Sequence, residues 1–534
     1  MRFSAAVLLP LLLGSASASR RFGHHVQNVL DDHAASHLLV SGGADDVEHL
    51  YTDAVVDHFD DGVLGGPEAK WRQRFYYDDS FCQQDGCPVF LYIGGEGPQG
   101  PPTSRLLMYT LAKENGALMV SLEHRFYGES YPTADMSNAN LKYLTSEQAL
   151  GDLARFIDYI SGLSPGSSPL SDPALSVSHR ASSTKWVAFG GSYPGNLATW
   201  LKLKYPASVV GSVGSSAPLA ADYNFYRYAQ VVGSALAMPL IGGSDQCYSS
   251  VEKAMEELHD VVKSTKPNGT SKDLPMALRP CTPINSDLDL YTYESNVYGN
   301  FQGTVQYNMQ NTAATVADVC AEMTSDSHKT PLEALNSMVD KYFNTPQAAG
   351  EATCIASSWD EMLKSLREEK FDGQSAMRQW IYQSCNEFGY FQTTEGDAHP
   401  FTALTSASLL NAGERMCEDA YNIKDYKGPQ TSGSGAYASD ERYGARRVLG
   451  ANITMPNGSA DPWSSLGVVN ETAAFYDETQ ELTDSEKIVF IDGTAHCRDM
   501  YAPGIFAANG FPDTGAVVWA HQQVNASVRE YLGL

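Results

Sequence analysis

The sequence has little positive charge and, after its first 20 residues, no run of about 18 apolar residues. Lys and Arg number 36 against 63 Asp and Glu, which gives a formal net charge of −27. This excess of negative charge argues against a nucleic-acid partner and against anionic membrane surfaces. Because no later apolar run is long enough, we expect no membrane span in the mature chain, which should be soluble.

Cysteine pairs in C-x-x-C spacing and histidine clusters that suggest zinc are missing as well. We therefore expect no metal site and no cofactor. Five of the thirteen histidines (24, 25, 33, 37 and 49) lie in a polar segment, residues 19–50. We interpret this segment as a flexible leader or propeptide, with metal binding as the minor alternative.

The chain begins with MRFSAAVLLPLLLGSASASR. Arg2 supplies a positive start, residues 5–13 form a short apolar run, and Ala16-Ser17-Ala18 is a cleavage site of small residues. This order is typical of a secretory signal peptide, which we assign to residues 1–18, because the apolar run is too short to span a membrane. We expect the mature protein in the secretory pathway, either extracellular or in a lysosome or vacuole.

Nine cysteines in a secreted chain predict disulfides with one cysteine left over. Cys82 and Cys87 flank four residues and can close a small loop, whereas Cys497 stands apart from the rest. Five N-x-S/T sequons also suit secretion. One of them begins at Asn457. We expect glycans at the other four, which are Asn268, Asn452, Asn470 and Asn525.

Short apolar runs alternate with helical patterns in the first half of the chain. Strands are predicted at 88–93, 117–122, 186–189 and 209–213, with regular structure beginning near Val55. Helices are predicted after Thr145, which forms a capping box with Gln148, and over 196–205. Strand and helix in alternation predict a parallel sheet with covering helices, the α/β class.

The middle of the chain differs, because helical patterns dominate from about 225 to 435. A capping box at Ser249 and Glu252 predicts the start of one of these helices. Strand signals return at 488–491, and a last helix follows. We therefore predict one α/β domain in two parts, residues 51–224 and 436–534, interrupted by a helical cap at 225–435.

The stretch FGGSYPGN, residues 189–196, raises the question of a catalytic serine. The G-x-S-x-G turn of hydrolases needs glycine two places after the serine, but Pro194 stands there. A strict match occurs instead around Ser164, in a Pro/Ser-rich loop that follows a helix. Ser192 follows an apolar strand and precedes a helical segment, which is the context that the motif needs. Proline is tolerated in the first turn of a helix, so we predict Ser192 as the nucleophile, although a merely tight loop is the alternative.

A serine nucleophile needs a base and an orienting carboxylate, in the chain order Ser, acid, His for this fold. Asp461 lies on a turn after an extended segment, and His496 follows the predicted strand 488–491. A turn-opening aspartate and a solvated histidine are the ordinary alternatives. His124 precedes the serine, and we interpret it as a strand-end residue that pairs within Glu123-His124-Arg125.

At this point the sequence resembles the serine peptidase family of lysosomal Pro-X carboxypeptidase, dipeptidyl peptidase II and thymus-specific serine protease, the last being the most similar. The stretches that carry the resemblance are VVDHFDDG (55–62), WRQRFYYDDSF (71–81), FLYIGGEG (90–97), SLEHRFYGES (121–130), FGGSYPGN, SSAP (215–218), IGGSDQC (241–247), RQWIYQSCNEFG (378–389), NGSADPW (457–463) and AHCRDM (495–500). Members of the family more often have a small residue where this chain has Pro194.

The resemblance implies an α/β-hydrolase fold with a helical cap, and it supports Ser192, Asp461 and His496 as the triad. It also implies three disulfides that would staple the cap. These are Cys247–Cys320, Cys281–Cys354 and Cys385–Cys417. Cys497 would then be the free thiol, with a packing role. A homodimer is left open.

The predicted reaction is hydrolysis of a peptide bond through an acyl-enzyme. The oxyanion would be held by the N–H groups of Tyr193 and Gly95. Relatives cut after proline, and Trp463 is the candidate wall of a proline pocket, with a core role as the alternative. Glu96 could hold a substrate terminus by its charge or simply cap its loop. The rival functions are an esterase or lipase on the same fold and a catalytically silent secreted binding protein.

Overall fold

The structure is a computed structural model of the whole chain. It describes residues 48–59, 69–82, 86–162, 185–264, 273–310, 313–343, 354–371, 373, 376–424 and 435–534. The predicted signal peptide, nearly all of the predicted leader, Ser164 and Asn268 lie outside these residues.

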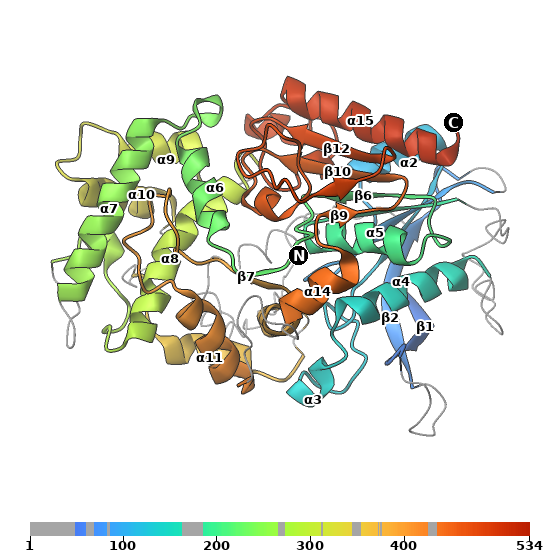
Figure 1. Cartoon of the computed structure of the whole chain (residues 1–534), viewed down its shortest axis with the longest axis horizontal. Coiled ribbons are helices and arrows are strands. Elements are labelled where there is room, and N and C mark those ends of the chain that lie inside the picture. Colours follow the sequence, from blue (N-terminus) through green and yellow to red (C-terminus); the bar gives the residue numbers. More distant parts are fainter. Residues whose placement is uncertain are drawn as a thin grey trace, which may run out of the picture.

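An eight-stranded sheet forms the centre of the molecule, in the order β1-β2-β4-β3-β5-β6-β10-β12 (Figure 1). Its strands are β1 (His49–Val55), β2 (Lys70–Asp78), β3 (Val89–Ile93), β4 (Leu118–Leu122), β5 (Trp186–Gly191), β6 (Gly211–Ser215), β10 (Ile453–Gly458) and β12 (Glu486–Ile491). β1 and β2 run antiparallel to their neighbours, and the other six strands are parallel to one another.

Helices cover both faces of this sheet, as Figure 1 shows. The helices of the core are α2 (Leu107–Asn115), α3 (Asn138–Leu141), α4 (Ser146–Ile160), α5 (Tyr193–Lys204) and α15 (Gly515–Leu532). α2 and α15 pack with Phe90 and Val187 on one face, whereas α4 and α5 pack with Leu91 and Ala188 on the other. A strand covered on both sides must be apolar throughout, and this explains why β4 is buried at every position. The protein thus has an α/β-hydrolase fold.

A large helical insertion separates β6 from β10, two strands that are neighbours in the sheet. Its helices are α6 (Arg227–Leu236), α7 (Asp245–Ser264), α8 (Asp287–Gln306), α9 (Val316–Met323), α10 (Pro331–Tyr342), α11 (Trp359–Arg367), α12 (Met377–Gln383), α13 (Met416–Tyr421) and α14 (Gly435–Tyr443). Most of them lie to the left of the sheet in Figure 1 and form the cap. Short strands β7 (Asp222–Asn224) and β8 (Gly389–Phe391) pair beside it, as do β9 (Arg447–Val448) and β11 (Glu481–Leu482).

Four disulfides are present, and they match the pairs expected from the sequence and the resemblance. They are Cys82–Cys87, Cys247–Cys320, Cys281–Cys354 and Cys385–Cys417. The last three close loops within the insertion, where each contributes about 2–4 kcal/mol by restricting the unfolded chain. Cys497 is a free, buried thiol.

Several local predictions need correction. β1 begins at His49, ahead of Val55. α7 begins at Asp245 rather than near Ser249, because the Ser244 hydroxyl already accepts a hydrogen bond from the main-chain N–H of Cys247. The capping box predicted at Thr145 does cap α4, since its side chain accepts from the N–H of Gln148. A competing cap one turn earlier is therefore enough to move a helix start.

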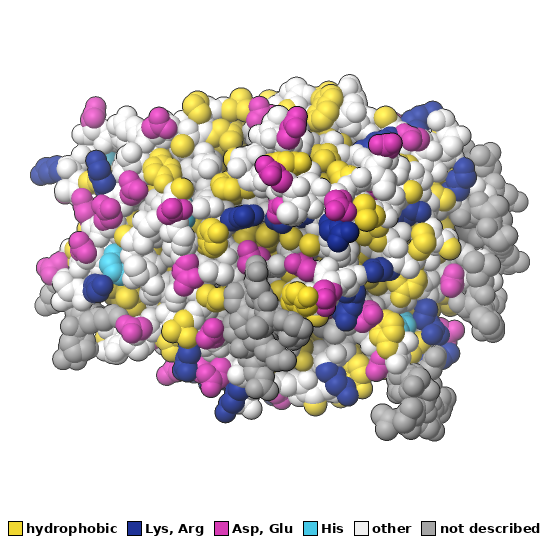
Figure 2. All heavy atoms as spheres, in the orientation of Figure 1, with side chains coloured by type: hydrophobic (Ala, Val, Ile, Leu, Met, Phe, Trp, Pro, Cys, Tyr) yellow, Lys and Arg dark blue, Asp and Glu magenta, His cyan; other side chains and the backbone are white. Residues whose placement is uncertain are grey.

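The acidic surplus is spread over the surface. On the face shown in Figure 2, Asp and Glu side chains lie over both the cap and the core, with basic side chains among them. In the described part of the chain no helix is long and apolar enough to cross a membrane. Within the same residues, no group of three or more His, Cys, Asp or Glu side chains could hold a metal ion.

Of the predicted glycosylation sites that the structure describes, Asn452, Asn470 and Asn525 are half-buried. Asn457, which begins the fifth sequon, is buried in β10, and its side chain donates a hydrogen bond to the main-chain oxygen of Val468. A glycan on Asn457 would not fit the folded protein, because its amide nitrogen has no room for a sugar. Glycosylation at Asn452, Asn470 and Asn525 stays a prediction.

Candidate active site

The residues predicted for catalysis follow four strands of the same sheet at their carboxyl ends. Gly95 follows β3, Ser192 follows β5, Asp461 follows β10 and His496 follows β12. Because these strands are parallel, their carboxyl ends meet at one edge of the sheet, where ligands of α/β proteins bind. Segments more than 400 residues apart in the sequence therefore contribute to one site.

Ser192 occupies the sharp turn between β5 and α5. Its backbone has φ 61° and ψ −131°, a conformation that costs energy for any residue except glycine. The turn is held by main-chain hydrogen bonds, because the N–H of Ser192 donates to the oxygen of Ser215 on β6 (2.9 Å) and the N–H of Asn196 donates to the oxygen of Ser192 (3.1 Å). Gly190 has no room for a Cβ atom, which would overlap the main chain of Pro194. A strained turn over-determined by its surroundings is what the nucleophile motif requires.

Pro194 fits the turn because α5 begins at Tyr193, which places the proline in the first helical turn, where no N–H is needed. Pro194 stands where the usual motif has a glycine that packs closely against the sheet. Gly195 takes over the close approach, since a Cβ atom there would lie 2.7 Å from the main-chain oxygen of Ser215. The helix therefore packs on β6 one residue later than the usual motif allows.

Asp461 and His496 form a buried pair. The Nδ1 atom of His496 lies 2.9 Å from both carboxylate oxygens of Asp461, and the main-chain N–H of Trp463 donates to Asp461 Oδ1 (2.9 Å). Burial opposes the charged imidazolium, but the Asp461 carboxylate and the Cys497 side chain together outweigh this, and the pKa of His496 is raised above its usual value. A carboxylate at Nδ1 leaves Nε2 free to accept a proton.

The main chain of His496 is held by the cap. Its N–H donates to the main-chain oxygen of Gln306, the last residue of α8 (3.0 Å). Its oxygen accepts from Nε2 of Gln310, in the turn that follows (2.9 Å). Sequence analysis missed both glutamines, since no motif marks them and they lie 186 residues or more from the histidine.

No hydrogen bond between Ser192 and His496 is found among those of the described residues. His496 Nε2 is buried and has no hydrogen-bond partner among the described residues. The loops themselves touch, because a Cβ atom on Gly191 would lie 2.9 Å from Cys497 Sγ. The N–H of Cys497 also donates to the hydroxyl of Ser216 (2.9 Å). Gly191 and Cys497, the neighbours of the two predicted catalytic residues, thus lie side by side.

Asp499 is a further link that the sequence does not reveal. Its Oδ1 atom accepts a hydrogen bond from the hydroxyl of Ser215 (2.6 Å), the residue whose oxygen holds the Ser192 turn. Burial raises the pKa of Asp499 to about 6. The histidine loop is therefore tied to the same strand end as the serine.

The proposed oxyanion donors also lie together. Gly95 packs against the Ser192 turn so closely that a Cβ atom on it would be 2.5 Å from Cγ of Pro194. Gly95, Gly191 and Pro194 line one small cavity of about 20 Å³. The N–H of Tyr193 begins α5 directly after the serine. Their roles as donors stay a prediction.

Trp463 lies in an aromatic cluster between the base and the cap. Its ring centroid is 6.3 Å from that of His496, 5.4 Å from those of Phe225 and Tyr390, and 5.7 Å from that of Tyr228. Its indole N–H donates to Gln306 Oε1 (3.0 Å). Tyr390 belongs to this site although no sequence pattern indicated it, and its φ of 62° marks it as a strained position.

His124 is not part of the pair. Its Nδ1 is 2.7 Å from the main-chain oxygen of Arg125, its Nε2 is 3.0 Å from the Tyr193 hydroxyl, and burial lowers its pKa to about 4. The expected pairing within Glu123-His124-Arg125 is found for the His124 ring, which meets the main chain of Arg125, whereas the Glu123 carboxylate binds Arg74 and the Arg125 guanidinium binds Asp152. Adjacent residues on a strand end point in different directions and so find separate partners.

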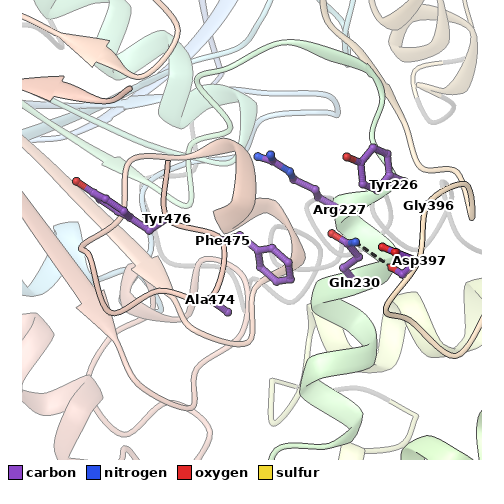
Figure 3. Close-up of a pocket in the computed structure, with 8 residues that line it drawn as sticks. All are labelled: Tyr226, Arg227, Gln230, Gly396, Asp397, Ala474, Phe475 and Tyr476. Carbon is purple, nitrogen blue, oxygen red and sulfur yellow. Dashed lines mark hydrogen bonds between the residues drawn. The ribbon is translucent and has the colours of Figure 1, made fainter. Parts of the chain in front are cut away.

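An open groove of about 580 Å³ lies where the cap meets the core (Figure 3). Arg227 of α6 and Phe475 of the loop before β11 extend into the same space from opposite sides, while Gln230 donates to the main-chain oxygen of Asp397 (2.9 Å). Arg227 precedes Tyr228, which contacts Trp463. The groove thus lies on the outer side of the helix that lines the aromatic cluster.

The profile of the serine carboxypeptidase S28 family, Peptidase_S28, matches residues 54–504. The chain belongs to this family. It is 34% identical to thymus-specific serine protease of Mus musculus over 80% of this chain and 78% of the relative. It is 32% identical to the protein of that name from Homo sapiens, over 92% and 89%. It is 26% identical to lysosomal Pro-X carboxypeptidase of Bos taurus, over 85% and 82%.

Among solved structures, an esterase from Pyrobaculum calidifontis covers 95% of this chain with 12% identity and a TM-score of 0.29. Such a low score says nothing about the site. Membership of the S28 family makes the protein a serine-type peptidase that acts on peptides. Its disulfides are compatible with the secretory pathway.

Proposed function

We propose that this S28 peptidase cuts peptide bonds after proline, with Ser192 as nucleophile, His496 as base and Asp461 as orienting acid. The observation that carries the proposal is the buried contact between His496 Nδ1 and the Asp461 carboxylate, beside a serine in a strained strand–helix turn. This arrangement supports acyl transfer, because a carboxylate at Nδ1 leaves Nε2 as the atom that can take the serine proton.

The mechanism follows from the roles of these groups. As the Ser192 hydroxyl attacks the carbonyl carbon of the substrate, His496 Nε2 takes its proton, and the N–H groups of Tyr193 and Gly95 stabilise the oxyanion. The protonated imidazole then gives its proton to the leaving amine, which leaves an acyl-enzyme. Water, deprotonated by the same histidine, hydrolyses this ester and restores the free serine.

Proline preference is supported by the aromatic cluster around Trp463. A proline ring fits a small apolar pocket with aromatic walls. The ring of Trp463 lies 6.3 Å from that of His496, and Tyr390 and Phe225 each lie 5.4 Å from Trp463, so the three rings supply such walls. The relatives' names include a Pro-X carboxypeptidase, which adds to this support.

The test is digestion of a proline-containing peptide library by the purified protein at pH 4 to 7, with cut sites determined by mass spectrometry. We expect cuts on the carboxyl side of proline. Ser192→Ala should lose about 10⁶-fold in kcat and all labelling by a fluorophosphonate probe. Ser164→Ala removes the serine of the strict G-x-S-x-G match and serves as the matched control, which should keep both.

Several outcomes would contradict the proposal. Faster turnover of short-chain esters than of any prolyl peptide would indicate an esterase. Failure of the probe to react at pH 5 and at pH 7 would indicate a silent binding protein. Loss of labelling in Ser164→Ala instead of Ser192→Ala would identify Ser164 as the nucleophile.

We further propose that the protein is extracellular or lysosomal and carries N-linked glycans. The disulfides and the predicted signal peptide support this location. Expression with the native leader should release a protein whose mass falls on treatment with an N-glycosidase. A homodimer stays a prediction, which light scattering would test.

A further inference from the structure

Glu96 is a buried acid for which the triad has no use. It follows Gly95 in the loop after β3, and only 3% of its surface is exposed. Its Oε2 atom has no hydrogen-bond partner in the described part of the chain. A buried polar atom without a partner is costly, so such atoms are rare away from functional sites.

The surroundings of Glu96 place it at the catalytic centre. His496 is the ionisable group whose charge acts on it, and no Lys or Arg among the described residues does so. In turn, its charge acts on Tyr92 of β3, on Tyr127 after β4 and on Tyr390 of β8. The acid is thus near enough to His496 and to Tyr390 for its charge to act on both.

Space for one small group exists beside this acid. The cavity of about 20 Å³ is lined by Glu96 together with Gly95, Gly191 and Pro194. That volume holds roughly one water-sized group, which is also the size of a single substrate oxygen. The cavity lies between the loop proposed for the oxyanion and the turn that carries Ser192.

The carboxyl group is neutral over much of the acidic range. Burial raises the pKa of Glu96 to about 7, and the residue's own main-chain N–H and the charge of His496 only partly oppose this. A protonated carboxyl group is a hydrogen-bond donor, whereas a carboxylate only accepts. His496 Nε2 is a second buried atom of this site without a hydrogen-bond partner. In the proposed reaction it gains one when it accepts the serine proton.

We propose that Glu96 is a further substrate-binding residue, whose neutral carboxyl group donates a hydrogen bond from Oε2 to a main-chain oxygen of the bound peptide. The acceptor is a carbonyl oxygen or a terminal carboxylate oxygen, which share this chemistry. Because Oε2 is closed to solvent, the carboxyl group turns towards the cavity as the peptide enters. The inference rests on the proposed function.

The sign of the pH dependence follows from the donor role. The hydrogen bond is present while Glu96 is protonated, and it is lost as the pH rises through about 7. His496 must be neutral to accept the serine proton, and its raised pKa moves the acid limb of the profile up towards the pH at which Glu96 titrates. The contribution of Glu96 is therefore measured on the alkaline side of the profile.

The test compares kcat/KM from pH 4 to 9 for the wild type, Glu96→Gln and Glu96→Leu. The glutamine still donates but does not titrate, so the alkaline limb near pH 7 should disappear. The leucine cannot donate, and kcat/KM at pH 5 should fall about tenfold. Glu387→Gln is the matched control, because burial also raises the pKa of Glu387 to about 7 while Ser146 already donates to both of its oxygens. The control should keep the alkaline limb.

A binding measurement separates this inference from the proposed function. Calorimetry of Ser192→Ala with a proline-containing peptide, in buffers of different ionisation enthalpy, should show proton uptake near pH 7. Uptake that disappears in Ser192→Ala/Glu96→Gln supports the inference even if the wild type cleaves nothing. A peptide with an amidated C-terminus that takes up protons as before identifies a carbonyl acceptor, and one that does not identifies the terminal carboxylate.

Three results would overturn the inference. An alkaline limb that persists in Glu96→Gln would show that another group titrates. Activity of a folded Glu96→Leu equal to that of the wild type at pH 5 would show that no substrate bond is lost. Loss in Glu96→Gln confined to peptides with a free N-terminus, and absent with acetylated ones, would show that a charged Glu96 binds an ammonium group instead.

Discussion

Ser192 and His496, the proposed nucleophile and the proposed base, are held in different ways. The main chain of Ser192 hydrogen-bonds only within the core, to β6 and to its own helix. The main chain of His496 hydrogen-bonds to Gln306 and Gln310, which belong to the cap. The cap thus helps to position the proposed base, whereas the core alone holds the proposed nucleophile.

The largest expected effect comes from replacing Asp461, the carboxylate that contacts the proposed base. Asp461→Asn keeps the size of the side chain but favours the wrong imidazole tautomer, and kcat should fall about 10⁴-fold. Steady-state kinetics with the best prolyl peptide measures this, with circular dichroism to verify folding. A loss below tenfold in a folded variant would remove Asp461 from the triad.

A smaller effect tests the hydrogen bonds by which the cap holds the main chain of His496. Gln310→Ala removes the hydrogen bond to the His496 oxygen, and we expect a fall of about tenfold in kcat with little change in KM, because a misplaced base slows chemistry more than binding. Its matched control is Gln302→Ala on α8, a buried glutamine that bonds Gln392 instead. An equal fall in kcat in both variants would mean that the Gln310 hydrogen bond only stabilises the cap. Thermal unfolding would then show the lower stability.

The smallest effect of a single substitution is expected at Pro194, in the turn that carries the proposed nucleophile. Pro194→Ala restores a small residue, and kcat/KM should change by no more than a few fold, while the free energy of unfolding falls by about 0.4–1 kcal/mol as the unfolded chain gains freedom. Denaturant unfolding and peptide kinetics measure the two quantities.

Gly95→Ala sharpens this comparison, since the added Cβ atom would lie 2.5 Å from Pro194 Cγ but 4.0 Å from its Cβ. Gly95→Ala should therefore be harmful alone and largely rescued in Gly95→Ala/Pro194→Ala, where Cγ is gone. Equal activity of the single and the double variant would show that this contact does not position the oxyanion loop.

Much of this site could be predicted from the sequence because its parts are local. A strand, a tight turn and a helix are encoded within about ten residues around Ser192. The Asp461 and His496 loops likewise each follow their own strand. The unusual Pro194 was interpretable for the same reason, although the packing role of Gly195 needed the neighbouring strand β6 to be visible.

Other parts could not be predicted, because the partners come from distant segments. Gln310 meets His496 across 186 residues, and Tyr390 reaches the nucleophile helix through a hydrogen bond from Asn196, 194 residues away. The separate partners of Glu123 and Arg125 were missed for the same reason. Nothing in the local pattern of these residues distinguishes a bond to the cap from ordinary burial.

By itself, the sequence determined the alternation of strands and helices, the long helical insertion and the three short stretches that carry the serine, the acid and the histidine. These depend on periodicity and turn chemistry, which act between near neighbours. Only the tertiary structure decided that the cap holds the histidine and that a buried glutamate is left with an unpaired oxygen beside it. Contacts of that kind depend on how two distant packing surfaces meet, and no local pattern encodes that meeting.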